Sequence, residues 1–201
     1  YAFFPGCVLE GASKEAHIAT MKVAAALGIE LVEIPGWTCC GASHLQEVDE
    51  LGAAAVNGRN IALAEQMELP ILTVCNTCTL MLRKTKSQLD GGLKDKVNGI
   101  LASAGIQYRG TQPITHLLWA ILRDYGLEKL QQKVTKPLKN LKVAPYYGCH
   151  ILRPPKVMDF EDHLNPTSLE KLIRALGAEP VEFSHRLSCC GFHATYTAND
   201  D

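Results

Sequence analysis

Short apolar runs alternate with longer stretches of helical periodicity in the first part of the chain. Each run leads into a turn signal or a cysteine, and the runs cover residues 1–4, 30–34 and 71–74. Helical patterns occupy residues 14–27 and about 47–67, where Ser13 is a favourable N-cap residue and Gly28 a favourable C-terminal stop. The pattern therefore predicts three buried strands connected by helices.

The order strand, helix, strand, helix, strand is typical of an α/β layer with a parallel sheet. Ligands of such sheets bind in the crevice beyond the carboxyl ends of the strands. Cysteines follow all three predicted strands, at Cys7, at Cys39 and Cys40, and at Cys75 and Cys78. Because the strand ends of one parallel sheet meet at one edge, we expect five thiols at a single rim.

The second part of the chain repeats features of the first in the same order. A run ending in Gly-Cys, a helix end leading into a strand, and a Cys-Cys-Gly triplet occur at residues 1–7, 26–33 and 39–41 and again at 143–149, 175–182 and 189–191. Three matching elements indicate duplication of one unit. We predict two pseudo-symmetric α/β units with cysteine loops at the strand carboxyl ends, residues 1–125 and 142–201, connected by segment 126–141.

Composition favours a globular protein and argues against two classes of partner. The chain has 201 residues, of which 47% are hydrophobic, and this is enough to fill a core. A formal net charge of −1 gives no basic footprint for nucleic acid or for an anionic membrane surface. No apolar run approaches the roughly 20 residues that span a bilayer, and the start lacks the basic region of a signal peptide. We expect a soluble, cytoplasmic protein without a transmembrane segment.

Cysteine grouping favours a metal centre over a disulfide framework. Eight cysteines in a chain of this length and core content do not fit a small disulfide-stapled scaffold. Adjacent cysteines in an extended segment point in opposite directions, so a Cys-Cys pair suits a centre with several metal atoms better than one ion. The first half supplies five thiols, whereas tetrahedral zinc takes four ligands, and zinc stays open as a substitute.

The cysteine pattern resembles a known family. The segments Pro5-Gly6-Cys7, Cys39-Cys40-Gly41 and Cys75-Asn76-Thr77-Cys78 are similar to the cysteine-rich CCG domain of the heterodisulfide reductase B subunit, and the resemblance extends over nearly the whole chain. It implies a noncubane [4Fe-4S] cluster in each complete motif and cleavage of a disulfide between two clusters. The implied ligands of the first cluster are Cys7, Cys39, Cys40, Cys75 and Cys78, and those contributed to the second are Cys149, Cys189 and Cys190.

The second motif departs from the family pattern. A further Cys-x-x-Cys should follow Cys190 at a spacing similar to that between Cys40 and Cys75, and the sequence extends only to Asp201. We expect the additional pair in a tail beyond Asp201. Without that pair, the second unit would bind its metal incompletely.

Two classes of function agree with the resemblance. In the first, the chain is the catalytic component of a heterodisulfide-reductase-type complex, equivalent to the B subunit. A ferredoxin-like iron–sulfur subunit and a flavoprotein subunit then exchange electrons with it for disulfide reduction or the reverse thiol oxidation. In the second, it is an electron-transfer or membrane-tethering subunit of a succinate, glycerol-3-phosphate or lactate dehydrogenase complex that passes electrons to a quinone. A zinc-bearing structural module fits the repeated triplets less well.

Three histidines lie within a few residues of a cysteine, namely His44, His150 and His193. Histidine donates and accepts protons near neutral pH, so each is a candidate catalytic residue facing a substrate crevice. A histidine that is simply hydrogen-bonded beside a loop is the ordinary alternative. The cysteine pattern specifies the cluster and not the substrate pocket, so the substrate stays open between a coenzyme disulfide, a lipoyl-type thiol and a quinone.

Overall fold

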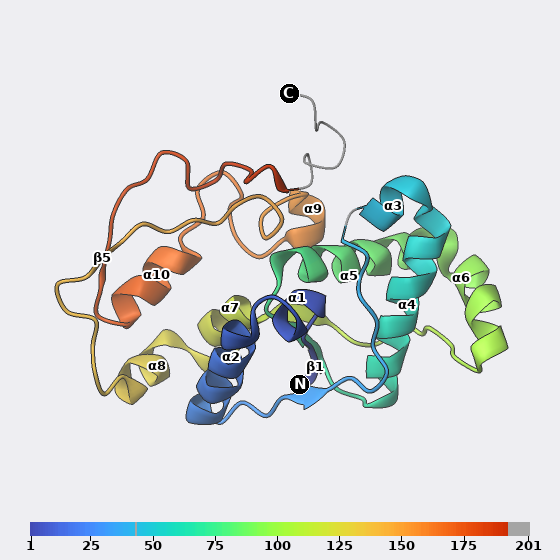
Figure 1. Cartoon of the computed structure of the whole chain (residues 1–201), viewed down its shortest axis with the longest axis horizontal. Helices are drawn as coiled ribbons and strands as arrows, with labels where there is room; N and C mark the ends of the chain where they lie inside the picture. Colours follow the sequence, from blue (N-terminus) through green and yellow to red (C-terminus); the bar gives the residue numbers. More distant parts are fainter. Residues whose placement is uncertain (43, 193–201) are drawn as a thin grey trace. The chain divides into compact units, whose positions relative to one another are not determined.

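The computed structural model describes residues 1–42 and 44–192, and the chain divides into two compact units (Figure 1). Unit 1 is Tyr1–Leu117 and unit 2 is Leu118–Asp201. A short helix, α7 (Leu117–Trp119), crosses the boundary. The segment predicted as a connection, 126–141, contains a helix of unit 2, α8 (Leu127–Lys133). The sequence repeat is thus distributed over both units.

Unit 1 is built on a four-stranded sheet in which all neighbouring strands are parallel. The order is β2-β1-β3-β4, and the strands are β1 (Ala2–Phe4), β2 (Val32–Glu33), β3 (Ile71–Thr73) and β4 (Ile114–His116). In this register Phe3 lies opposite Leu72, and Leu72 lies opposite Thr115. The predicted α/β fold with parallel strands is confirmed.

Helices connect these strands, as parallel pairing requires. In unit 1 they are α1 (Cys7–Glu10), α2 (Lys14–Leu27), α3 (His44–Val48), α4 (Glu50–Gln66), α5 (Asn76–Gln88), η1 (Leu89–Leu93), α6 (Lys94–Leu101) and η2 (Ala102–Ala104). Gly28 ends α2 in the left-handed conformation with φ of 69°, as predicted. The helix predicted at 47–67 is divided, because Asp49 caps α4 by accepting the N–H of Gly52 at 2.8 Å.

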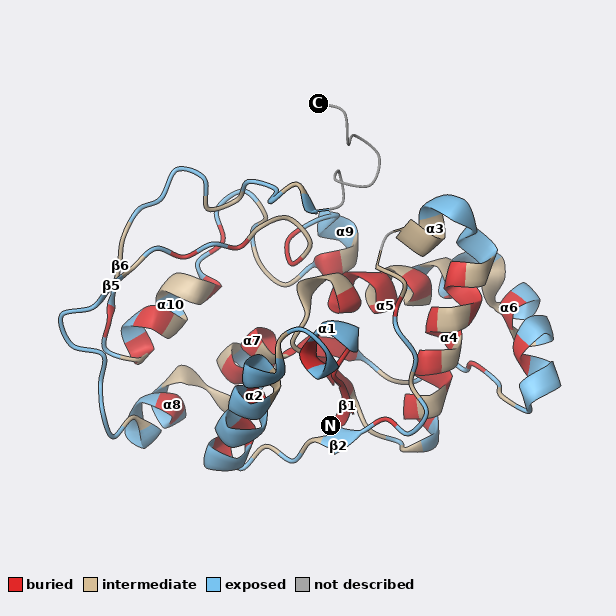
Figure 2. Ribbon diagram, viewed as in Figure 1, coloured by how far each residue is buried: buried red, intermediate tan, exposed pale blue. Residues whose placement is uncertain are grey.

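The core of unit 1 is formed by the sheet together with α4, α5 and α6. All residues of β1 and β3 are buried, and Figure 2 shows buried faces on α4 and α5, whereas α2 is largely exposed. Small residues such as Ala54 and Ala62 line α4, where they permit close packing. Among the helices that the structure describes, none combines the length and the apolar character needed to cross a membrane.

Two features of this sheet differ from the sequence prediction. The expectation of a buried strand at 30–34 is wrong for β2, an edge strand whose Val32 and Glu33 are both exposed. Only the following residue, Ile34, enters the core, at 1% exposure. The sequence pattern also gives no indication of β4. Its three residues, Ile-Thr-His, include a single apolar residue, so no apolar run separates them from the helical stretch that follows.

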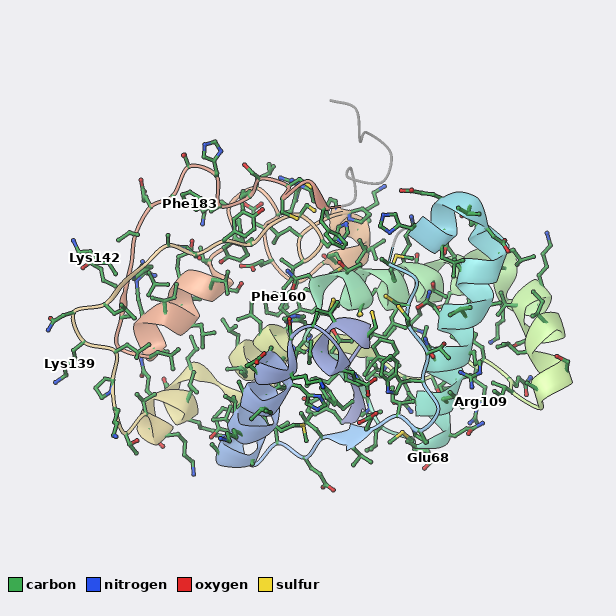
Figure 3. The ribbon with its side chains drawn as sticks, viewed as in Figure 1. Glu68, Arg109, Lys139, Lys142, Phe160 and Phe183 are labelled. Carbon is green, nitrogen blue, oxygen red and sulfur yellow. The ribbon has the colours of Figure 1, made fainter. Side chains whose placement is uncertain are left out.

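Unit 2 contains a smaller sheet of two parallel strands. β5 (Lys142–Val143) pairs with β6 (Glu179–Pro180). Its other elements are η3 (Ala120–Tyr125), α8, α9 (Pro155–Met158) and α10 (Ser168–Ala175). Trp119 is 2% exposed and stacks on Phe160, labelled in Figure 3, with ring centroids 4.9 Å apart. A parallel strand pair followed by cysteine loops in each unit supports the predicted duplication, which stays a prediction.

A buried carboxylate fixes the loop that precedes β4. Glu65 in α4 is 1% exposed and accepts backbone N–H groups from Arg109 at 2.7 Å, Gly110 at 2.6 Å and Thr111 at 2.7 Å. Arg109 is labelled in Figure 3. Three charge-assisted hydrogen bonds offset the desolvation of the carboxylate. Glu65 therefore connects α4 to the segment that enters the edge of the sheet.

Replacing Glu65 with Gln should lower the free energy of unfolding by roughly 2–3 kcal/mol. The amide NH₂ group would face N–H donors that it cannot satisfy, at similar side-chain volume. Urea denaturation followed by circular dichroism measures the change. Gln66→Ala is the control, because Gln66 is exposed on the same helix and should cost at most about 0.5 kcal/mol. Equal losses in the two variants would contradict the role assigned to Glu65.

Candidate metal centre

The five cysteines of unit 1 follow the carboxyl ends of three adjacent strands. Cys7 begins α1 after β1, and Cys39 and Cys40 lie in the segment after β2. Cys75 is the N-cap of α5 after β3, and Cys78 lies in the first turn of that helix. The parallel sheet thus delivers all three cysteine segments to one edge, as predicted.

The thiols at this rim meet in two groups. The Cys39 Sγ lies 3.3 Å from the Cys7 Sγ, and the Cys40 Sγ lies 3.5 Å from the Cys78 Sγ. The Cys75 Sγ belongs to the second group, because it accepts the backbone N–H of Cys78 at 3.5 Å. The adjacent residues Cys39 and Cys40 therefore point to different partners, as expected for neighbours in an extended segment.

The two groups differ in their access to solvent. Cys7 and Cys39 are exposed, whereas Cys40 is 3% exposed and Cys78 is 4% exposed. Cys75 is intermediate. One side of the rim is thus open to water, and the other side belongs to the hydrophobic core.

Gly6 permits the close approach of these groups. Its backbone has φ of 77° and ψ of 155°, a region that is essentially restricted to glycine. A Cβ atom at this position would lie 2.9 Å from the Cys78 Sγ. Directly after Cys40, Gly41 turns with φ of 75° and donates its N–H to the Cys39 Sγ at 3.4 Å. Both glycines are therefore required by the geometry of the thiols.

The environment of the thiols separates their pKa values. The hydrogen bond from Cys78, assisted by N–H groups at the start of α5, lowers the pKa of Cys75 to about 6. Although Cys39 is exposed as a residue, partial desolvation of its sulfur, together with the hydrogen bond to Cys7, raises the pKa of Cys39 to about 11. Within the buried pair, the thiol of Cys78 keeps its proton, because its hydrogen bond to Cys40 raises its own pKa and lowers the pKa of Cys40. Metal binding at this rim must therefore release protons.

Two buried asparagines of α4 hold the backbone of the Cys39-Cys40 segment. The Asn57 side chain donates to the carbonyl of Cys40 at 3.0 Å. The Asn60 side chain donates to the carbonyl of Thr38 and accepts its N–H, both at 2.9 Å. The asparagines are 0% and 1% exposed. Sequence reasoning missed them, although two amides within an alanine-rich buried helix were an available signal.

β4 adds a buried histidine to the carboxyl edge of the sheet. His116 is 8% exposed and lies opposite Thr73 of β3, two residues before Cys75. Burial lowers the pKa of His116 to about 4, so the ring is neutral near pH 7. Sequence reasoning missed His116 because it missed β4.

Unit 2 reproduces the Cys7–Cys39 half of this arrangement, with Cys149 half-buried and Cys189 exposed. The Cys149 Sγ lies 3.8 Å from the Cys189 Sγ, and Gly191 donates its N–H to the Cys189 Sγ at 3.4 Å. Gly148 and Gly191 have φ of 69° and 77°, close to the values of their counterparts in unit 1. Cys190 is exposed. The three cysteines predicted in unit 2 thus lie in two adjacent loops, and two of them are in contact.

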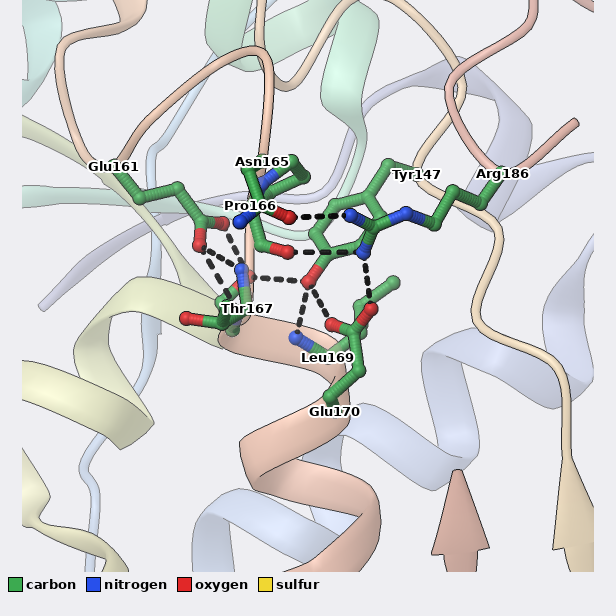
Figure 4. Close-up of polar contacts among 9 residues, drawn as sticks. Tyr147, Glu161, Asn165, Pro166, Thr167, Leu169, Glu170 and Arg186 are labelled. Carbon is green, nitrogen blue, oxygen red and sulfur yellow. Dashed lines mark hydrogen bonds and ion pairs between the residues drawn. The ribbon is translucent and has the colours of Figure 1, made fainter. Parts of the chain in front are cut away.

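A polar network in unit 2 holds these two loops together (Figure 4). The backbone N–H of Tyr147 donates to the carbonyl of Arg186 at 2.8 Å. The Tyr147 hydroxyl donates to Glu170 at 2.5 Å and accepts the N–H of Leu169 at 2.8 Å. Arg186 forms an ion pair with Glu170, and both side chains are largely buried. Because Tyr147 and Arg186 shortly precede Cys149 and Cys189, the network sets the spacing of those cysteines.

The histidines predicted as catalytic candidates occupy different situations. His44 is the first residue of α3. His150 lies in the turn that directly follows Cys149. His193 is outside the described residues. A catalytic role for any of the three stays a prediction.

The donor set suits an iron–sulfur cluster by its chemistry. Thiolates are the usual ligands of such clusters, and unit 1 brings five cysteines to one rim. The thiols contact one another in groups, and within residues 1–42 and 44–192 no set of three or more His, Cys, Asp or Glu side chains is arranged to hold a metal ion.

Comparison with known proteins adds independent evidence. The CCG family, described as a cysteine-rich domain, matches residues 1–83 and 143–201. The chain is 54% identical over 198 residues to the 8-methylmenaquinol:fumarate reductase membrane anchor subunit of Wolinella succinogenes, covering 98% of this chain and 69% of that protein. It is 34% identical over 193 residues to the B subunit of the ferredoxin:CoB-CoM heterodisulfide reductase of Methanosarcina mazei, covering 94% of this chain and 64% of that protein.

A solved structure also resembles this chain. It is the crystal structure of a hypothetical protein from Helicobacter pylori, with a TM-score of 0.62 and 13% sequence identity. The similarity covers 93% of this chain and 33% of that one. At this identity, the match shows a shared fold alone.

Changing Gly6 to Ala should disturb the buried thiols as well as the backbone. Gly126→Ala is the matched control, because Gly126 also precedes a helix, with φ of 96° and ψ of 138°, and no described atom lies within 4 Å of its added Cβ. Each variant should lose on the order of 1–3 kcal/mol through backbone strain. Only Gly6→Ala should make Cys78 react faster with iodoacetamide in the folded protein. Unchanged labelling of Cys78 would argue against the contact.

Proposed function

Because the chain belongs to the CCG cysteine-rich domain family, which includes the B subunit of heterodisulfide reductases, we propose that it is an iron–sulfur subunit of an oxidoreductase complex. The observation that carries the proposal is the meeting of five thiols from three parallel strand ends at one rim. Relatives named as subunits of larger enzymes support it. The chain spans about two thirds of each of those relatives, so the partners and the substrate are part of the proposal.

The proposed ligands of the cluster in unit 1 are Cys7, Cys39, Cys40, Cys75 and Cys78. In unit 2, Cys149, Cys189 and Cys190 contribute to a second centre that a further Cys-x-x-Cys would complete. The group that we propose is a noncubane [4Fe-4S] cluster in each complete motif, with zinc as an alternative occupant. When bound, the cluster supplies one-electron oxidation and reduction.

The cysteines around the rim differ in what they would contribute to such a site. Cys40 and Cys78 lie in the core, where they exclude water from one side of the site. Cys7 and Cys39 lie on the open side, which is where an electron donor, an acceptor or a substrate can approach. Asn57 holds the carbonyl of Cys40, which fixes the backbone between the buried and the open side.

Of the two roles expected from the sequence, we place electron transfer with a quinone-type carrier first. The supporting observation is the identity of 54% to a protein whose name specifies reaction of a methylmenaquinol and fumarate, compared with 34% to the B subunit of a heterodisulfide reductase. In this role the chain passes electrons within a complex and is held to a membrane by its partners or by segments outside 1–201.

Catalytic disulfide reduction, or the reverse thiol oxidation, is the second candidate. Its support is that relatives named as B subunits of heterodisulfide reductases match most of the chain, and the CCG family match includes both cysteine motifs. A ferredoxin-like iron–sulfur subunit and a flavoprotein subunit would then be the electron partners. The cysteines are compatible with both roles because they determine the cluster and leave the reacting partner undetermined.

Anaerobically prepared full-length protein should contain about four iron atoms and equal acid-labile sulfide per complete motif, as a [4Fe-4S] cluster requires. Cys40→Ser should lose the iron of unit 1 and keep the iron of unit 2, because each unit has its own thiols. Val48→Ala is a control, since Val48 is 87% exposed and supplies no thiol. Folded protein with stoichiometric zinc and no iron after anaerobic reconstitution would remove the redox function.

An activity comparison separates the two roles. The reconstituted full-length protein is supplied with an artificial one-electron donor, and turnover is measured with a panel of disulfides and with a soluble quinone. If electron transfer is the role, Cys40→Ser and Cys190→Ser should lose quinone-linked turnover, while any slow reaction with disulfides should be the same in wild type and variants. Loss of disulfide turnover in both variants, with quinone reactivity retained, would establish the second candidate.

A further inference from the structure

Two exposed thiols in unit 1 lie at the distance from which a disulfide can form. The Cys7 and Cys39 Sγ atoms are 3.3 Å apart, and a disulfide bond is about 2.05 Å long. Closing this pair needs a further approach of roughly 1.3 Å between the two sulfurs. Neither residue lies within a strand, so the pairing of β1 and β2 is not disturbed. The geometry therefore permits oxidation without refolding.

Access to oxidant separates this pair from the others. Thiol–disulfide exchange proceeds through a mixed disulfide, which requires that a small disulfide reach one of the sulfurs. Cys7 and Cys39 are exposed and can be reached, whereas Cys40 and Cys78 are 3% and 4% exposed. The buried pair is 3.5 Å apart, so its protection is due to burial and not to distance.

The adjacent cysteine of unit 1 does not offer a competing bond. Cys39 points to Cys7 and Cys40 points to Cys78, on opposite sides of the extended segment. Asn57 holds the carbonyl of Cys40 at 3.0 Å, which opposes the backbone rotation that a bond between adjacent cysteines needs. Cys7 is therefore the partner that Cys39 can reach without a change of backbone.

Unit 2 repeats this pair with one exposed and one half-buried thiol, and it has no counterpart of the buried pair among its described residues. The Cys149 and Cys189 Sγ atoms are 3.8 Å apart, and Cys189 is exposed. The Tyr147–Arg186 hydrogen bond at 2.8 Å holds the two loops next to each other. Cys190 follows in the same loop and is exposed, so after Cys149 and Cys189 have paired it is left as a single accessible thiol.

We propose that Cys7 with Cys39, and Cys149 with Cys189, are reversible oxidation sites of the protein without bound metal. A small disulfide such as oxidised glutathione is the oxidant. One protein thiolate attacks it and releases one glutathione thiol, and the partner thiolate then displaces the second. Each pair loses two electrons and two protons, one protein S–S bond forms, and the S–S bond of the oxidant breaks to give two small thiols.

After this oxidation, the paired cysteines are no longer able to bind the proposed metal centre. With the bond between Cys7 and Cys39 formed, the open side of the unit 1 rim has lost both of its thiols, while the buried Cys40 and Cys78 keep theirs. A dithiol reductant reverses both steps. Formation of the two disulfides follows from the distances and the exposure of the thiols. Only the predicted effect on metal uptake rests on the proposed function.

The test uses metal-free full-length protein treated with oxidised glutathione, followed by alkylation and peptide mass spectrometry. The expected products are the cross-links Cys7–Cys39 and Cys149–Cys189, glutathione on Cys190, and Cys40 and Cys78 that alkylate only after unfolding. Iron uptake under anaerobic conditions should then fall at least several-fold until dithiothreitol is added. Cross-links Cys39–Cys40 or Cys40–Cys78 in folded protein would overturn the proposal.

Matched variants make the assignment specific. Cys7→Ser should abolish the cross-link of unit 1, place glutathione on Cys39 and leave Cys149–Cys189 intact as an internal standard. Cys149→Ser should abolish the cross-link of unit 2, place glutathione on Cys189 and leave Cys7–Cys39 intact. Glutathione on all exposed cysteines of the wild type, without either cross-link, would also overturn the proposal. Formation of both cross-links in a protein that takes up no iron after reduction would instead contradict the proposed function alone.

Discussion

The candidate centre depends on the parallel pairing of β1 with both β2 and β3. Parallel strands point their carboxyl ends in one direction, so the segments that follow them begin at one edge. Phe3 lies opposite Glu33 on one side and opposite Leu72 on the other. A slip of one residue would displace a following loop by about 3.3 Å, which equals the whole distance between the Cys7 and Cys39 sulfurs. Register is thus a condition for bringing the thiols together.

Strands of two or three residues cannot hold such a register alone, and α4 supplies the additional constraint. Three of its buried polar side chains bind backbone outside the helix. Asn57 and Asn60 hold the segment that contains Cys39 and Cys40, and Glu65 holds the loop that leads into β4. Each side chain must make these bonds, because a buried amide or carboxylate without a partner is costly. One helix therefore positions a cysteine segment at one end and the sheet edge at the other.

Local patterns in the sequence predict only part of this arrangement. Three strands, the end of α2 at Gly28, and the convergence of five cysteines follow from apolar runs, a glycine and the strand order. β4 and the exposure of Val32 were missed, because Ile114 is the single apolar residue of β4 and the edge of a sheet is decided by distant segments. Asn57 and Asn60 were missed for a related reason. Their partners lie some twenty residues away, and no local pattern links an amide in a helix to a loop carbonyl.

The two units show which part of the site is local and which is not. In both, a Gly-Cys step and a Cys-Cys-Gly turn with positive φ bring one pair of thiols together outside the core, at 3.3 Å and 3.8 Å. In unit 1 that pair lies beside strands of a four-stranded sheet, whereas in unit 2 the network around Tyr147 and Arg186 holds it. The glycine turns are therefore common to both pairs of thiols, whereas the surrounding structure that holds each pair in place differs between the units. The contact between the buried thiols depends on more of the fold, because β3 and α5 place Cys78 next to Cys40. Burial of that half is what turns an exposed thiol pair into a site with a protected interior.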